Sequence, residues 1–103
     1  MTRETAEKLL REMLAAAGLP VRGSYRPGEV CAILGIGDRT FWSLIQRYER
    51  DERGALRRPD CLDSFMLSSN RRVTYAELTD YLCRNQTWQR QNAIHPDQMH
   101  LFD

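Results

Sequence analysis

The sequence has no long apolar run, no large surplus of charge of one sign and almost no lysine. No stretch of roughly 18 apolar residues occurs in the 103-residue chain, so we expect no membrane-spanning segment. The chain starts with a charged amphipathic pattern rather than a secretory signal, which predicts a cytoplasmic protein. The formal net charge of +1 neither favours nor excludes a nucleic-acid partner. All of the 15 basic residues except Lys8 are arginine, whose planar donors fit phosphate and guanine edges, although a GC-rich genome would give the same bias.

Cysteine is scarce, and its spacing fits no metal site. Cys31, Cys61 and Cys83 form no C-x-x-C pair, and His95 and His100 lie far from them along the chain, so we expect no metal and no other cofactor. Cys31 and Cys83 fall on apolar helix faces and are interpreted as small core residues. No nucleophile accompanies a candidate base, and no glycine-rich loop could cradle a phosphate group. We therefore expect a protein that is not an enzyme.

Three amphipathic helices are predicted in the first half of the chain. An apolar stripe at helical spacing predicts a helix over 2–17, which Thr2 would cap and Gly18 would stop. After a linker over 21–24, a short helix begins at 25–29, with a proline in its first turn, and ends at Gly35. A third helix follows Gly37, and its buried stripe is Phe41, Leu44, Ile45 and Tyr48.

In the second half of the chain, the apolar residues first alternate as in a β-hairpin and then follow the spacing of a helix. Leu62, Phe65 and Leu67 predict one strand, Ser69–Asn70 a turn, and 71–73 a short return strand. The segment 74–77 is interpreted as a capping box at the N-terminus of a helix, with Glu77 as its acidic member. Leu78, Tyr81 and Leu82 give that helix an apolar face. The polar remainder, 86–103, is predicted to be a flexible tail.

The segment 27–45, PGEVCAILGIGDRTFWSLI, resembles the DNA-binding module of MerR-type regulators and phage excisionases. Glu29-Val30, Ile33-Leu34, the turn 35–37, Thr40 with Phe41, and Leu44-Ile45 match the family pattern, and 65–82 resembles the wing and the helix that follows it. The resemblance covers 25–82 and implies a mainly α fold with a small β-hairpin, a winged helix-turn-helix, here preceded by an extra N-terminal helix. The chain departs from the family in a longer link over 50–62 and in lacking the dimerising coiled coil and effector domain.

A DNA-contacting face follows from this arrangement. If the apolar stripe of the third helix is buried, its other face presents polar and aromatic side chains to a major groove, where Arg could bind guanine or phosphate, Gln46 adenine, and Trp42 the sugar-phosphate backbone. The wing tip offers short donors and two arginines for phosphate or minor-groove contacts, and a pair of arginines before it could add a phosphate clamp. The predicted DNA-contacting residues are Arg39, Thr40, Trp42, Ser43, Gln46, Arg47, Arg57, Arg58, Ser69, Asn70, Arg71 and Arg72. A plain solvated helix face would look similar.

The tail carries a second signal. The segment 98–103, QMHLFD, is similar to the bacterial sliding-clamp-binding motif, so Gln98, Met99, Leu101 and Phe102 are candidate partner-binding residues, unless they fold back onto the domain. The chain is thus divided into an N-terminal helix and linker (1–24), a winged helix-turn-helix (25–85) and a tail (86–103). The expected function is binding of double-stranded DNA as a small regulator or excisionase-like protein. The alternatives are a replication- or plasmid-associated adaptor for the clamp and a protein-interaction module. The oligomeric state is open, although packing of the first helix on the core is favoured over dimerisation through it.

Overall fold

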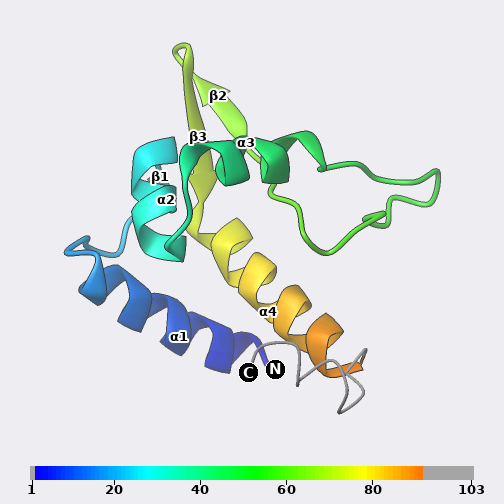
Figure 1. The fold of residues 1–103 in the computed structure, drawn as a ribbon, viewed down its shortest axis with the longest axis horizontal. Helices are drawn as coiled ribbons and strands as arrows, with labels where there is room; N and C mark the ends of the chain where they lie inside the picture. Colours follow the sequence, from blue (N-terminus) through cyan, green and yellow to red (C-terminus); the bar gives the residue numbers. More distant parts are fainter. Residues whose placement is uncertain (1, 92–103) are drawn as a thin grey trace.

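The elements form four helices and one three-stranded antiparallel sheet in residues 2–91, the part of the chain that the computed structural model describes (Figure 1). The expected coarse class, mainly helical with a small sheet, is confirmed. The strand order is β1-β3-β2. In chain order the elements are α1 (Arg3–Ala16), β1 (Ser24–Tyr25), α2 (Pro27–Leu34), α3 (Asp38–Gln46), β2 (Phe65–Leu67), β3 (Asn70–Thr74) and α4 (Tyr75–Gln91).

Helix α1 forms as its sequence predicts. The Thr2 hydroxyl accepts a hydrogen bond from the Thr5 backbone N–H at 3.2 Å and so satisfies one of the free donors of the first turn. Ala6, Leu10 and Leu14 lie on one face and are buried in the same core as residues of α2, α3 and α4. The expectation that α1 packs on the core is therefore confirmed.

Helices α2 and α3 meet in a tight turn. The Glu29 carboxylate accepts a hydrogen bond from the Arg26 backbone N–H at 2.9 Å at the start of α2, and α2 ends at Gly35, whose φ of +68° favours glycine. Phe41 and Leu44 of α3 are fully or almost fully buried, whereas Ile45 is only half-buried. A short helix, a tight turn and a second helix therefore follow one another in the predicted order. Tyr48 was expected on the buried stripe of α3, but it lies beyond the end of that helix and is half-buried.

A short strand replaces part of the expected linker and helix start. Ser24 and Tyr25 pair with Thr74 and Val73 as β1. The buried Tyr25 hydroxyl donates to the Pro20 carbonyl at 2.7 Å and accepts from the Arg22 backbone N–H at 2.8 Å. Because both hydrogen bonds join Tyr25 to earlier residues, they hold the segment between α1 and β1 against the sheet.

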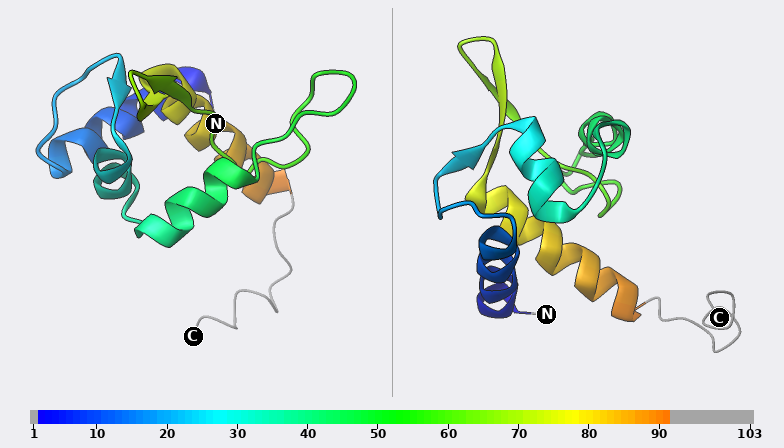
Figure 2. Two further views of the ribbon diagram at one scale, coloured as in Figure 1. Left: turned by 90° about the horizontal axis from the view of Figure 1, so that it is seen from above. Right: turned by 60° about the vertical axis from the view of Figure 1, so that its left-hand side comes forward.

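The β2–β3 hairpin differs from its prediction in the position of the turn and in burial. Leu67 pairs with Asn70, and the two turn residues are Ser68 and Ser69, with φ of +50° and +69°, one position earlier than predicted. Phe65 and Leu67 were expected to alternate inward, but both are exposed. The reason is visible in Figures 1 and 2: the hairpin projects away from α1 and α4, so no layer covers it.

The start of α4 corrects the predicted role of Glu77. The Glu77 backbone N–H donates to the Thr74 hydroxyl at 3.0 Å, as in a capping box, but the Glu77 carboxylate turns away from the helix start. It accepts from the Asp63 backbone N–H at 3.0 Å and from the Arg84 guanidinium at 2.7 Å. Helix α4 continues to Gln91, past the expected start of the tail at residue 86, and the rest of that tail lies outside the described residues.

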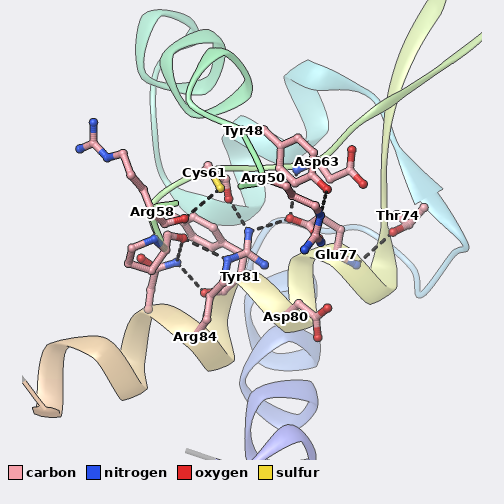
Figure 3. Close-up of polar contacts among 12 residues, drawn as sticks. Tyr48, Arg50, Arg58, Cys61, Asp63, Thr74, Glu77, Asp80, Tyr81 and Arg84 are labelled. Carbon is pink, nitrogen blue, oxygen red and sulfur yellow. Dashed lines mark hydrogen bonds and ion pairs between the residues drawn. The ribbon is translucent and has the colours of Figure 1, made fainter. Parts of the chain in front are cut away.

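The long link between α3 and β2 is held to α4 by hydrogen bonds. Figure 3 shows the Arg84 side chain reaching the backbone of this link, where it donates to the Pro59 carbonyl at 3.0 Å and to the Cys61 carbonyl. Asn85 donates to the same Pro59 oxygen at 2.9 Å. Cys61 is itself fully buried, and burial raises the pKa of its thiol. None of the helices within residues 2–91 is long and apolar enough to cross a membrane.

Candidate nucleic-acid interface

Helix α3 exposes the polar face that its sequence predicts. Arg39, Trp42 and Gln46 follow one another at intervals of three and four residues, so they line one side of the helix, and all three are exposed. Thr40 is exposed beside them and Ser43 is half-buried. Since Phe41 is fully buried on the other side, α3 separates an apolar inner face from a polar outer face.

Three of the predicted arginine contacts are already engaged with carboxylates. Arg47, at the end of α3, donates to the Asp60 carboxylate at 3.0 Å. The same carboxylate accepts two hydrogen bonds from Arg58, both at 3.1 Å. Arg57 lies 3.6 Å from Glu49. These pairs compensate the charge of Arg57 and Arg58, the predicted phosphate clamp in the link between α3 and β2, and that of Arg47, a predicted contact of the helix face.

Trp42 of α3 and Arg71 of β3 bring the helix and the hairpin together. The Arg71 guanidinium lies over the Trp42 ring, 5.6 Å from its centre, and it also donates to the Ser64 hydroxyl at 2.5 Å. The rings of Phe41 and Trp42 pack in a T-shaped arrangement with their centres 5.1 Å apart, so Phe41 supports the indole from the core side. Trp42 remains 42% exposed, so one part of the ring faces solvent. The predicted surface of α3 and the predicted wing are therefore neighbours in space.

A groove runs between α3, the hairpin and the start of α2. Its volume is about 360 Å³ and it is lined by Arg26, Pro27, Trp42, Met66, Ser69, Asn70 and Arg71. Four of these residues, Trp42, Ser69, Asn70 and Arg71, were predicted as DNA contacts. Arg26, Pro27 and Met66 were not predicted. The packing of α2 against β3 brings Arg26 and Pro27 to the groove, and Met66 reaches it because it pairs with Arg71 in the hairpin.

Positive charge on this side of the molecule has few acidic partners. Within the described part of the chain, Arg26, Arg39, Arg71 and Arg72 form no ion pair with a carboxylate, in contrast to Arg22, Arg47, Arg57, Arg58 and Arg84. The Nε of Arg72 is buried without a hydrogen-bond partner among the described residues. Since these arginines have no carboxylate partner among the described residues, the surface they form is complementary to an external anion.

Two acidic residues near this surface are held by other groups. Burial alone would raise the pKa of Glu29, but the Arg26 backbone N–H and the side chain of Arg22 outweigh it and lower the pKa. Asp38, in the first turn of α3, accepts a hydrogen bond from the Cys31 thiol at 3.6 Å. Burial, with Asp38 as a second cause, raises the pKa of Cys31. Cys31 is half-buried, at the edge of the core rather than fully inside it.

The residues predicted to bind the sliding clamp, Gln98, Met99, Leu101 and Phe102, lie outside the described residues. Within 2–91 no three or more His, Cys, Asp or Glu side chains gather as a metal site would require. Comparison of the chain with family models, with curated proteins and with solved structures gives no match.

Proposed function

We propose that this protein binds double-stranded DNA, with α2, the turn and α3 as a helix-turn-helix and the β2–β3 hairpin as its wing. The single observation that carries the proposal is the continuous surface of Arg39, Trp42 and Arg71, in which two arginines without an intramolecular ion pair flank an exposed aromatic ring. Neither arginine pairs with a carboxylate among residues 2–91, and the phosphate oxygens of DNA are anionic acceptors that both could bind.

The outer face of α3 suits a major groove by its chemistry. Arg39 can donate hydrogen bonds from both of its terminal nitrogens to guanine O6 and N7, and Gln46 can pair with adenine through its amide. Thr40 and Ser43 can donate to bases or to the backbone. Asn70, Arg71 and Arg72 on the wing can bind the phosphates beside the groove. Such a protein would act in the cytoplasm as a small transcriptional regulator or an excisionase-like protein.

Fluorescence anisotropy with a labelled pool of random-sequence duplexes, at two or more salt concentrations, tests this proposal. The logarithm of affinity falls with the logarithm of salt concentration by about 0.9 for each phosphate neutralised, so binding should weaken steeply as salt rises. Arg71→Ala should reduce that slope by about one. On duplexes selected from this pool by the wild-type protein, Arg39→Ala should weaken binding by about 1–3 kcal/mol, since a good bidentate arginine–base contact contributes about that much discrimination between bases.

Arg11→Ala is the matched control. It removes the same charge from the exposed side of α1, across the core from α3 (Figure 1). Binding by Arg11→Ala should equal that of the wild-type protein. The proposal fails if the wild-type protein leaves duplex DNA unbound at low salt. It also fails if Arg11→Ala weakens binding as much as Arg39→Ala, because net charge alone would then explain the affinity.

A further inference from the structure

Trp42 places an apolar ring in the middle of the polar outer face of α3. It follows Arg39 by three residues and precedes Gln46 by four, so these two side chains lie on either side of it along the helix. The ring is 42% exposed, whereas Phe41 and Leu44 of the same helix are buried. A tryptophan at the centre of a surface that would face DNA calls for an apolar partner, because leaving so large a ring in water is unfavourable.

The Trp42 ring is held in this position by neighbours from two elements. Phe41 packs against it in a T-shaped arrangement with the ring centres 5.1 Å apart. The Arg71 guanidinium of β3 lies over the ring, 5.6 Å from its centre, and donates a hydrogen bond to the Ser64 hydroxyl at 2.5 Å. These contacts oppose rotation of the ring toward the edge of α3. The exposed part of the indole therefore meets a partner in a fixed orientation, which lowers the entropic cost of binding.

The groove between α3 and the hairpin combines apolar and cationic lining residues. Pro27, Trp42 and Met66 contribute apolar surface, and Arg26 and Arg71 contribute positive charge. Among the groups that base pairs present in the major groove, the 5-methyl group of thymine is apolar, and the others are hydrogen-bond donors or acceptors. A donor or acceptor pressed against the carbon atoms of an indole would lose water without gaining a partner. A pyrimidine 5-methyl group is therefore the base feature that matches Trp42.

We propose that Trp42 determines sequence specificity by contacting the 5-methyl group of a thymine in the major groove, between the bases that Arg39 and Gln46 contact. This inference rests on the proposed function and names the base that the central residue of α3 selects. The sequence alone suggested a contact of Trp42 with the sugar-phosphate backbone. Because Arg39 and Gln46 flank Trp42 on the helix, docking that brings both of them to base edges brings Trp42 to the bases as well. The same methyl group occurs in 5-methylcytosine, so the contact favours either base over uracil and unmodified cytosine.

Substitution of deoxyuridine for thymine tests the contact, since it removes the methyl group and leaves the hydrogen bonds of the base pair unchanged. Fluorescence anisotropy is measured on a duplex selected by the wild-type protein, with each thymine replaced in turn. Replacing the contacted thymine should weaken binding about fourfold, the contribution of one buried methyl group, and the other replacements should leave the affinity unchanged. At the contacted position, a duplex with 5-methylcytosine should bind more tightly than one with cytosine by the same factor.

Trp42→Ala should abolish the difference between thymine and uracil at that position, whatever its effect on the overall affinity. Leu67→Ser is the matched control. Leu67 is 52% exposed, and its pairing with Asn70 places it on the opposite face of the hairpin from Met66, away from the groove. Leu67→Ser should therefore retain the full difference. Circular dichroism verifies that Trp42→Ala is folded, and Trp42→Gln, whose longer side chain can still cover Phe41, replaces it otherwise.

Each outcome bears on the inference separately from the proposed function. If no replacement by deoxyuridine weakens binding of the wild-type protein, Trp42 contacts the backbone, and this inference is wrong while the proposed function stands. The inference is equally wrong if the Trp42 variant retains the difference, because another residue then contacts the methyl group. It is also wrong if methylation of cytosine has no effect, because the uracil effect then reflects the shape of the duplex. If the wild-type protein binds no duplex, both proposals fail together.

Discussion

Replacing Arg84 with methionine tests whether the link between α3 and β2 is held by α4. The Arg84 guanidinium donates to the carbonyls of Pro59 and Cys61 and to the Glu77 carboxylate. Arg84 and Glu77 are only 18% and 14% exposed, so water replaces these bonds poorly. Methionine keeps the apolar stem of the side chain, so the variant removes the charge and the donors with little change in packing.

The expected loss follows from the number and kind of bonds removed. A hydrogen bond between neutral groups contributes about 1 kcal/mol and one to a charged group about 1.5–3 kcal/mol. Removing one partner of a well-buried ion pair costs about 3–5 kcal/mol, and the residual exposure of Arg84 and Glu77 reduces this. We expect Arg84→Met to lower the free energy of unfolding by about 2–4 kcal/mol, which in a domain of this size lowers Tm by roughly 10–20 °C.

Urea denaturation followed by circular dichroism gives this free energy directly. Arg58→Met is the control: it also removes an arginine that pairs with a carboxylate, but Arg58 and Asp60 are exposed enough that the pair contributes only about 0–1 kcal/mol. A double-mutant cycle of Arg84→Met with Glu77→Gln should give a coupling energy of about 1 kcal/mol or more. Equal losses from Arg84→Met and Arg58→Met, or strictly additive losses in the cycle, would refute the reasoning.

Two further predictions concern stability. Because the pKa of Glu29 is lowered on folding, its carboxylate stabilises the fold above pH 4.5, and that contribution is lost as pH falls below this value. Urea midpoints should therefore fall below pH 4.5 in the wild-type protein and fall less in Glu29→Gln; equal slopes would contradict the assignment. The double variant S68N/S69G should raise Tm by a few degrees, since Asn-Gly favours the positive φ of both turn residues at a gain of about 0.5–1 kcal/mol. A lower Tm would mean that Ser68 or Ser69 makes a stabilising contact.

The helices near the N-terminus could be predicted from the sequence because their signals are local. Thr2 lies next to the apolar stripe it caps, and Gly35 lies in the turn that needs its positive φ. The separation of Phe41 from Trp42 on α3 likewise depends only on helical period. Arg39, Trp42 and Gln46 were therefore predicted correctly as exposed, whereas Ser43 and Arg47 are half-buried.

The strands and the link could not be predicted, because their environment depends on residues far away in the sequence. β1 has only two residues, too few for a period, and it forms because Tyr25 pairs with Val73. The alternation of β2 predicted a buried face, but burial needs a second layer, and the hairpin extends beyond the helices (Figure 2). The capping-box pattern correctly predicted the hydrogen bond of the Glu77 backbone N–H. It did not predict that the Glu77 carboxylate accepts hydrogen bonds from Arg84 and from the link.

The position of the hairpin relative to α3 depends on contacts at both ends of β2 rather than on the link itself. After β2, Arg71 holds β3 to the Trp42 ring of α3. Before β2, Arg84 and Glu77 hold the link at Cys61 and Asp63 (Figure 3). Between α3 and these anchors, the chain forms a loop that is held by local contacts, among them the bridge between Arg50 and Leu56 and the backbone hydrogen bond from Arg57 to Glu49. We therefore expect that a change in the length of the link leaves the position of the hairpin relative to α3 unchanged.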